Sequence, residues 1–335
     1  MITIVNLNPC IDWQYNIPKF TYGGMNRVRR TYESAASKGT NVAIALKNLG
    51  LTPTCIGINF ADGGDKVREK FDSHGIPHDF ETVEGAVRVN IKVFEEETGI
   101  MTELNQPGSF VPEVYVHNLK NKVARLSTAD GILVLTGSLP AGVPENIYAE
   151  LTALWHGKVF LDADGGVLRQ ALSGEVKPYA VKPNLFELEN AFGIKLPIKY
   201  VGMPYMTSKK CPSTSADTIH RVPTKNNLAE KGLTHNLHGI PIACISMGAD
   251  GAILLTPDAA YFSPALDIEA RGIQGAGDAM VAGLILATLQ NLPPPEMLCY
   301  AMAAAAASVI MPGTEMCTRR GFEAMLEKIP PPEVL

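Results

Sequence analysis

The segment RGIQGAGDAMVAGLILATLQ, residues 271–290, joins a glycine-rich turn and one carboxylate to a long apolar run. Glycines ahead of a helix let backbone N–H groups converge on an anion, and the helix dipole favours negative charge there. Asp278 in this turn has two explanations: it caps the helix, or it takes a proton from a hydroxyl group that attacks a phosphate. The apolar run that follows predicts a buried helix at about 278–290.

Apolar runs of strand and helix length alternate along the rest of the chain. Strands are expected at residues 2–7, 54–60, 131–139, 158–165, 179–184, 240–248 and 251–256. Further helices are expected at residues 40–50, 64–75, 144–157 and 297–310. This alternation predicts an α/β fold, with a doubly wound, mostly parallel sheet flanked by helices.

Two parts of the chain interrupt this alternation within what we expect to be a single domain, 1–335. Residues 12–33 and 78–106 are half-polar and extended, and they predict a small antiparallel β-sheet that projects from the main sheet as a candidate lid. Residues 195–238 are rich in Pro, Ser, Thr and Lys, and they predict a long surface insertion.

The composition is that of an ordinary globular protein, with 46% hydrophobic and 19% charged residues. A net charge of −5 gives no general reason to expect nucleic acid or a membrane surface as a partner. The six cysteines form no CxxC pair, which is typical of a reducing compartment and signals neither a zinc ribbon nor a redox motif. The first residues lack the basic region of a signal peptide, and the apolar run 297–311 is too short to span a bilayer. We therefore expect a cytoplasmic protein.

The segment VKPNLFELENAFG, residues 181–193, places Asn184 and Glu187 three positions apart. In a helix that starts here, the two side chains form a capping box, with Asn184 as the cap. The same spacing lets both side chains hold Mg²⁺ through its water ligands. The local pattern favours the capping box.

Nucleotide-binding signals are weak when each is taken alone. The glycines of ISMGADGAILLT, residues 245–256, allow a nucleotide to approach the backbone closely, but a plain hairpin explains them equally well. The sequence contains no GxxxxGK[ST] loop and no GxGxxG after its first strand, which argues against P-loop and dinucleotide-binding folds.

Four basic residues lie in or beside the predicted small sheet: Arg27, Lys38, Arg88 and Lys92. Cations gathered around one cleft would bind a small phosphorylated substrate. Each of them alone is better explained as a solvated surface charge.

Taken together, these motifs resemble the PfkB (ribokinase-like) carbohydrate kinase family, closest to its 1-phosphofructokinase and tagatose-6-phosphate kinase branch. The resemblance covers residues 1 to about 325, apart from 195–238, and its motifs occur in the family's order. The matching segments are TIVNLNPCID, GGMNRV, KGTNVAIALKNLG, VRVNIKVFEEETGIMTELNQPG, GSLPAGVPENIYAEL, VKPNLFELENAFG, SMGADGAILL and GAGDAMVAG.

The resemblance implies ATP- and Mg²⁺-dependent phosphorylation of a sugar or sugar-phosphate hydroxyl group. A ketohexose phosphate such as fructose 1-phosphate or tagatose 6-phosphate is the expected substrate, and the expected assembly is a homodimer formed through the lid. Asp278 would be the general base, and the N–H groups of Gly275, Ala276 and Gly277 would form the anion hole.

The resemblance also implies two sets of binding residues. The substrate set is Asp12, Arg27, Lys38, Gly39, Asn41, Arg88 and Asn90. The nucleotide set is Lys182, Asn184, Glu187, Ser246, Gly248 and Gly251, in which Asn184 and Glu187 would order Mg²⁺ through its waters.

The sequence departs from the family pattern near both ligands. Ala36-Ser37 stands where the family has Gly-Gly in the sugar site, and Gly272-Ile273-Gln274 replaces Ser-Thr-Val before the anion hole. Two alternatives therefore stay open: a kinase of an unphosphorylated sugar or nucleoside on the same fold, and a non-catalytic sensor of a sugar phosphate or nucleotide.

Overall fold

The computed structural model describes residues 1–194, 237–270, 272, 274–313 and 315–335, so almost all of the expected insertion at 195–238 lies outside the described residues. The described residues form a large sheet of ten strands in the order β14-β13-β12-β11-β10-β9-β8-β1-β4-β5. These strands are β1 (Ile2–Asn6), β4 (Pro53–Asp62), β5 (His78–Ala86), β8 (Ile132–Thr136), β9 (Lys158–Asp162), β10 (Ala180–Val181), β11 (Ile242–Ser246), β12 (Ala252–Leu255), β13 (Ala260–Ser263) and β14 (Glu333–Val334). All neighbouring strands from β11 to β5 are parallel, and β12, β13 and β14 add an antiparallel edge.

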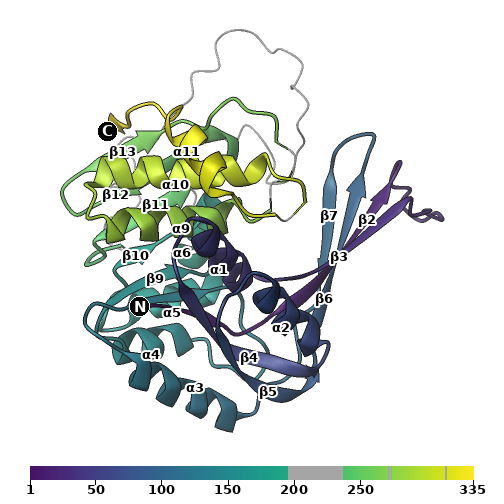
Figure 1. Ribbon diagram of the computed structural model, residues 1–335, viewed down its shortest axis with the longest axis horizontal. Coiled ribbons are helices and arrows are strands. Elements are labelled where there is room, and N and C mark those ends of the chain that lie inside the picture. Colours follow the sequence, from purple (N-terminus) through teal and green to yellow (C-terminus); the bar gives the residue numbers. More distant parts are fainter. Residues whose placement is uncertain (195–236, 271, 273, 314) are drawn as a thin grey trace.

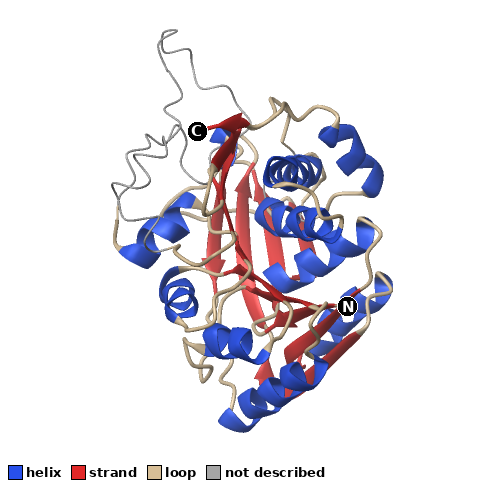
Figure 2. Ribbon diagram, turned by 90° about the vertical axis from the view of Figure 1, so that its left-hand side faces the viewer, coloured by secondary structure: helices blue, strands red, loops and turns tan. Residues whose placement is uncertain are grey.

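Helices cover both faces of the large sheet (Figure 2). They are α1 (Lys38–Asn48), α2 (Gly64–Ser73), α3 (Glu113–Leu126), α4 (Ile147–Leu154), α5 (Gly165–Ser173), α6 (Leu185–Phe192), α9 (Ala276–Leu289), α10 (Pro294–Val309) and α11 (Arg319–Leu326). Helix α9 packs against α1 and α10, whereas α3, α4, α5 and α6 pack against one another in sequence (Figure 1). The doubly wound α/β fold is therefore confirmed.

Helix α9 is the buried helix that the apolar run predicted. Every residue from Asp278 to Thr288 is buried. Gly283 lets α10 approach closely, because a Cβ atom there would lie 2.4 Å from the carbonyl oxygen of Tyr300. The apolar sequence and this glycine together explain how α9 packs between α1 and α10.

A second, small sheet projects from the main body (Figure 1). It contains β3 (Arg30–Ala36), β2 (Cys10–Ile17), β6 (Arg88–Glu95) and β7 (Met101–Asn105), in that order. The range 78–106 that we expected in the small sheet was wrong for residues 78–86. These residues form β5, which pairs with β4 at the edge of the large sheet. The small sheet is also mixed rather than antiparallel, since β2 and β6 run parallel.

The strand order reverses at β1, which lies between β8 and β4. In doubly wound sheets, ligands bind outside the carboxyl ends of the strands at such a reversal. Polar residues end three adjacent strands here in register: Asn6, Thr136 and Asp162. Lys182 directly follows β10 at the same edge. The fold therefore brings polar side chains from several strands to one place.

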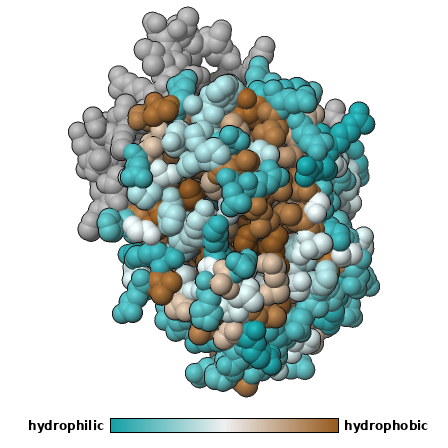
Figure 3. All heavy atoms as spheres, turned by 60° about the vertical axis from the view of Figure 1, so that its left-hand side comes forward, coloured by the Kyte–Doolittle hydropathy of each residue, from teal (hydrophilic) through white to brown (hydrophobic). Residues whose placement is uncertain are grey.

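The outer surface is mixed in character. Figure 3 shows one face with hydrophobic residues in its upper and central parts and a mostly hydrophilic lower margin. Scattered apolar surface is normal for a globular protein, so this face alone marks no site. No helix among the described residues is long and apolar enough to cross a membrane.

Candidate active site

The glycine-rich turn before α9 positions Asp278 in the first turn of the helix. Gly275 is the N-cap residue and has a φ of +77°, a conformation that favours glycine. Asp278 is 5% exposed, and its Oδ2 accepts a hydrogen bond from Asn41 Nδ2 of α1 at 2.8 Å. The carboxylate is therefore not the helix cap, and it faces another element. The first N–H groups of α9 have no acceptors within the helix, which is the requirement for an anion hole.

Burial, and then the nearby charge of Asp162, raise the pKa of Asp278 to about 7. Lys38, the hydrogen bond from Asn41 and Lys182 act in the opposite direction. A carboxylate whose pKa lies near neutrality is suited to accept a proton during a reaction at physiological pH.

Two lysines and two carboxylates lie beside Asp278. Lys38 Nζ is 3.3 Å from Asp162 Oδ1 and 3.3 Å from Glu187 Oε1. Lys182 Nζ is 3.4 Å from Asp162 Oδ1. Burial opposes ionisation of Asp162, but Lys182 and Lys38 outweigh it and lower the pKa of this carboxyl. Asp162 therefore stays charged while Asp278 titrates near neutrality.

The pKa of Lys38 responds to the same charges. Burial lowers it, but Asp162 and Glu187 outweigh that effect, so the net direction is upward. Lys38 was predicted to bind substrate, and here it pairs with carboxylates at the ends of β9 and α6. Its role toward substrate stays a prediction.

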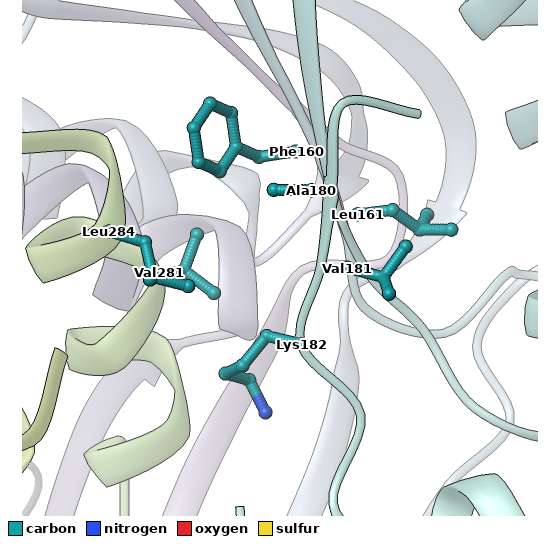
Figure 4. A pocket seen from close by; sticks show the side chains of 7 residues that line it. All are labelled: Phe160, Leu161, Ala180, Val181, Lys182, Val281 and Leu284. Carbon is teal, nitrogen blue, oxygen red and sulfur yellow. The ribbon is translucent and has the colours of Figure 1, made fainter. Parts of the chain in front are cut away.

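Lys182 reaches the glycine-rich turn from β10. Figure 4 shows its side chain directed toward α9, with Val281 and Leu284 of that helix nearby. A Cβ atom at Gly277 would lie 3.2 Å from Lys182 Nζ. The ammonium group of Lys182 therefore lies against the proposed anion hole, where it adds positive potential.

Asn184 and Glu187 form the capping box at the start of α6. Asn184 Oδ1 accepts from the N–H of Glu187 at 2.8 Å, and Glu187 Oε2 accepts from the N–H of Asn184 at 2.8 Å. The prediction of a capping box is therefore confirmed. Glu187 Oε1 remains directed at Lys38, so this carboxylate also faces the site.

The fit of this region to Mg²⁺ can be judged from its oxygen atoms. The described residues contain no group of three or more His, Cys, Asp or Glu side chains able to enclose a metal ion. Asp162 Oδ2, however, is buried without a hydrogen-bond partner. Mg²⁺ is usually held by one or two carboxylates together with waters and substrate phosphates. Asp162 and Glu187 fit such an open site.

The small sheet supplies a second polar cluster, on β2 and β6. Asp12 accepts a hydrogen bond from Asn90 Nδ2 at 3.0 Å and forms an ion pair with Lys92. Arg88 donates to Asn90 Oδ1 at 3.1 Å and to the carbonyl oxygen of Gln106 at 3.2 Å. Parallel pairing of β2 with β6 places Asp12 directly opposite Asn90. The structure thus brings three predicted substrate residues together.

Arg27 is not brought to this cluster within the chain. It lies in the exposed loop between β2 and β3 and forms no ion pair with a described residue. Gly39 and Asn41 lie in the first turns of α1, and a Cβ atom at Gly39 would be 3.0 Å from the Asn6 side chain.

The Ala36-Ser37 departure is accommodated without strain. Ser37 is the N-cap of α1 in an extended conformation, and its Oγ accepts from the N–H of Thr40 at 3.1 Å. The same hydroxyl donates to Asn6 Oδ1 at 3.1 Å. Ser37 therefore has an ordinary structural role as the cap of α1, and Ala36 is buried beside it.

The turn at Ser246, Gly248 and Gly251 joins β11 to its antiparallel neighbour β12, which confirms the hairpin. Gly251 has a φ of +105°, and a Cβ atom there would lie 2.1 Å from the carbonyl oxygen of Ser263. The backbone alone therefore requires this glycine. Ser246 pairs with Asn184 in a parallel bridge, so the turn lies next to the start of α6.

Sequence reasoning missed two residues of this site. Asp162 is the last residue of β9, within the strand expected at 158–165, and an acidic residue at the carboxyl end of a buried parallel strand could have signalled it. Gln274 was noted only as a departure from the family pattern, yet it contacts Lys92 at 2.6 Å. No local pattern distinguishes that glutamine.

The structure resembles solved kinases of the ribokinase-like fold. Phosphofructokinase-2 from Escherichia coli in complex with substrates and products superposes with a TM-score of 0.83 at 21% identity, over 98% of this chain and 99% of that one. Ribokinase from Thermotoga maritima gives a TM-score of 0.73 at 17% identity, over 97% and 99% of the two chains. The fold of this chain is thus the ribokinase-like fold.

Sequence comparison identifies the family within that fold. The model of the pfkB family of carbohydrate kinases matches residues 2–319, so the chain belongs to the pfkB family. It is 30% identical over 332 residues to the 1-phosphofructokinase of Escherichia coli strain K12, covering 98% of this chain and 97% of the relative. It is 31% identical over 308 residues to the 1-phosphofructokinase of Xanthomonas campestris pv. campestris, covering 90% and 88%.

Proposed function

We propose that this chain transfers the γ-phosphoryl group of ATP to the free primary hydroxyl group of a ketohexose phosphate, and that its substrate is fructose 1-phosphate. The single observation that carries this proposal is Asp278, a buried carboxylate with a pKa of about 7 at the glycine-rich start of α9. The relatives named 1-phosphofructokinase support the choice of sugar phosphate.

In this mechanism Asp278 takes the proton from the attacking hydroxyl group. The N–H groups of Gly275, Ala276 and Gly277 stabilise the negative charge that develops on the transferred phosphoryl group. Lys182 adds positive charge beside Gly277. Asn41 holds the Asp278 carboxylate in place through its hydrogen bond.

Mg²⁺ would be held on the nucleotide side by Glu187 and Asn184, through its waters, and by Asp162. When bound there, it would neutralise charge on the nucleotide phosphates. The nucleotide would lie along the carboxyl ends of β10 and β11. Its contacts would come from Lys182 and from the turn at Ser246, Gly248 and Gly251.

The sugar would lie between the small sheet and α1. Asp12 and Asn90 would bind its hydroxyl groups, with Gly39 and Asn41 contributing from α1. Arg88, Arg27 and Lys38 would bind the substrate phosphate.

The small sheet would act as a lid and as a homodimer interface. It and its loop carry a group of exposed apolar side chains: Trp13, Phe20, Tyr22, Met25, Val28, Tyr32 and Leu104. Met25 is 81% and Tyr22 is 96% exposed, and such a cluster is typical of a protein interface.

Analytical ultracentrifugation of the wild type and of Leu104→Asp tests this interface. We expect a wild-type dimer that dissociates in the variant, and a monomeric wild type would contradict the proposal. A phosphofructokinase-2 of Escherichia coli is described as tetrameric in an inhibited form, so a tetramer would mean a further interface.

One observation favours a second candidate, a kinase of an unphosphorylated sugar. Lys38 and Lys92, two of the four cations predicted for the phosphate, are paired with carboxylates. Only Arg88 and Arg27 are then left to bind a substrate phosphate, which is the reason to consider a neutral sugar.

Substrate specificity separates the two candidates. Purified protein with Mg²⁺-ATP is assayed for ADP release on fructose 1-phosphate, fructose 6-phosphate, tagatose 6-phosphate, fructose and ribose. We expect the highest kcat/KM on fructose 1-phosphate, and Arg88→Met should raise KM for that substrate about tenfold or more. Turnover confined to the neutral sugars would overturn the proposal in favour of the second candidate.

A further inference from the structure

Gln274 bridges the glycine-rich turn and the small sheet. Its Oε1 accepts a hydrogen bond from Lys92 Nζ of β6 at 2.6 Å, and its Nε2 donates to Glu103 Oε1 of β7 at 3.0 Å. Lys92 and Glu103 are directly opposite each other across these two strands. One amide group therefore spans a cross-strand pair of opposite charge, with its acceptor toward the cation and its donor toward the carboxylate.

The contact continues from Lys92 to the sugar-side cluster. Lys92 forms an ion pair with Asp12, and both side chains are less than 10% exposed. Asp12 in turn accepts a hydrogen bond from Asn90. At its other end Gln274 directly precedes Gly275, the N-cap residue of α9. An unbroken series of hydrogen bonds thus connects Asp12 with the turn that holds Asp278.

We propose that Gln274 is a positioning residue that fixes Asp12, through Lys92, at one distance from the anion-hole turn. The inference rests on the proposed function, in which the small sheet holds the sugar and the turn holds the phosphoryl group. Reaction between two such groups requires the attacking and transferred atoms to be about 3–3.5 Å apart. The small sheet and the glycine-rich turn hold different reactants, so they reach that separation reproducibly only when a contact fixes one against the other.

The charge arrangement gives a direct test by Gln274→Glu. The new carboxylate still accepts from Lys92, but it faces Glu103 and repels it. We expect KM for fructose 1-phosphate to rise about tenfold, which corresponds to about 1.4 kcal/mol. KM for ATP should change less than twofold, because the nucleotide residues lie on β10, β11 and α6. A general loss of structure would raise both KM values together, and that result would contradict the proposal.

The decisive variant combines Gln274→Glu with Glu103→Gln. This exchange moves the amide and the carboxylate to each other's positions and restores a donor opposite each acceptor. KM for fructose 1-phosphate should return to within about twofold of the wild type. Gln274→Glu combined with Glu33→Gln is the matched control, since Glu33 lies on β3 and pairs with Lys66. The control should give no rescue. Failure of the exchange variant, or equal rescue by the control, would overturn the inference.

A second readout does not depend on catalysis. Hydrogen–deuterium exchange of residues 88–105, in the protein without substrates, should be several times faster in Gln274→Glu and normal in the exchange variant. If the wild type phosphorylates no ketohexose phosphate, the proposed function fails, but this measurement still tests the bridge. Unchanged exchange in Gln274→Glu would show that Gln274 does not position the small sheet.

Discussion

The pH dependence of turnover should follow Asp278 and should move in opposite directions in two variants. Asp278 must be ionised to accept a proton, and its pKa is about 7. About one tenth of the wild-type enzyme is then active at pH 6, relative to pH 8. Asp162→Asn removes a negative charge that raises this pKa. We therefore expect the acidic limb of the profile of kcat against pH to move to lower pH by about one unit. The ratio of kcat at pH 6 to kcat at pH 8 should rise from about 0.1 to about 0.5.

Asn41→Leu should have the opposite effect, because its hydrogen bond favours the ionised carboxylate. The assay is ADP release at saturating ATP and fructose 1-phosphate from pH 5 to pH 9 at constant ionic strength. The substrate phosphate titrates near pH 6 by itself, but it does so equally in every variant. Limbs that coincide in all three proteins, or that move in the reverse order, would refute the assignment of this titration to Asp278.

Three further outcomes concern stability. Above about pH 4 the folded protein keeps a proton on Asp278 that the unfolded chain has lost, so stability falls as pH rises toward 7. In urea unfolding, Asp278→Asn should therefore raise the free energy of unfolding at pH 8, by at most about 4 kcal/mol, and leave it unchanged at pH 3. Gly251→Ala should cost more than about 2 kcal/mol in urea unfolding, because its Cβ atom would lie 2.1 Å from a carbonyl oxygen of β13. The control Gly50→Ala, at a φ of +89° with no neighbouring atom near its Cβ, should cost about 1 kcal/mol. Equal losses in the two variants would show that the structure relieves the close contact at Gly251. Ser37→Ala should cost about 1 kcal/mol through the lost helix cap, and a neutral result in the same assay would mean that water replaces the hydroxyl.

Much of the large sheet could be predicted from the sequence, since buried parallel strands and the apolar helix α9 are signalled by local patterns. Helix α3 was missed although Val116, Leu119 and Val123 have helical spacing and are buried. Strand β5 was assigned to the wrong sheet because half-polar edge strands look alike, whichever sheet they join. Strand partners are set by tertiary packing, which no local pattern records.

The candidate site was predictable only in part. Ordered motifs identified Asp278, Asn41 and Asn90, and the structure brings the first two within hydrogen-bonding distance. The pairing of Lys38 with Asp162 connects residues 124 positions apart, and the bridge from Gln274 to Lys92 spans 182 positions. Such contacts depend on how helices and sheets pack, so the sequence shows the residues without showing their partners.

The most direct test of the account is the kcat of Asp278→Asn on fructose 1-phosphate, measured beside Asp130→Asn as an exposed carboxylate control. We predict that kcat falls by about 10³-fold or more in Asp278→Asn, while ATP binding and the folded state persist and the control matches the wild type. A kcat within tenfold of the wild type in Asp278→Asn would contradict the claim that this carboxylate activates the substrate hydroxyl group.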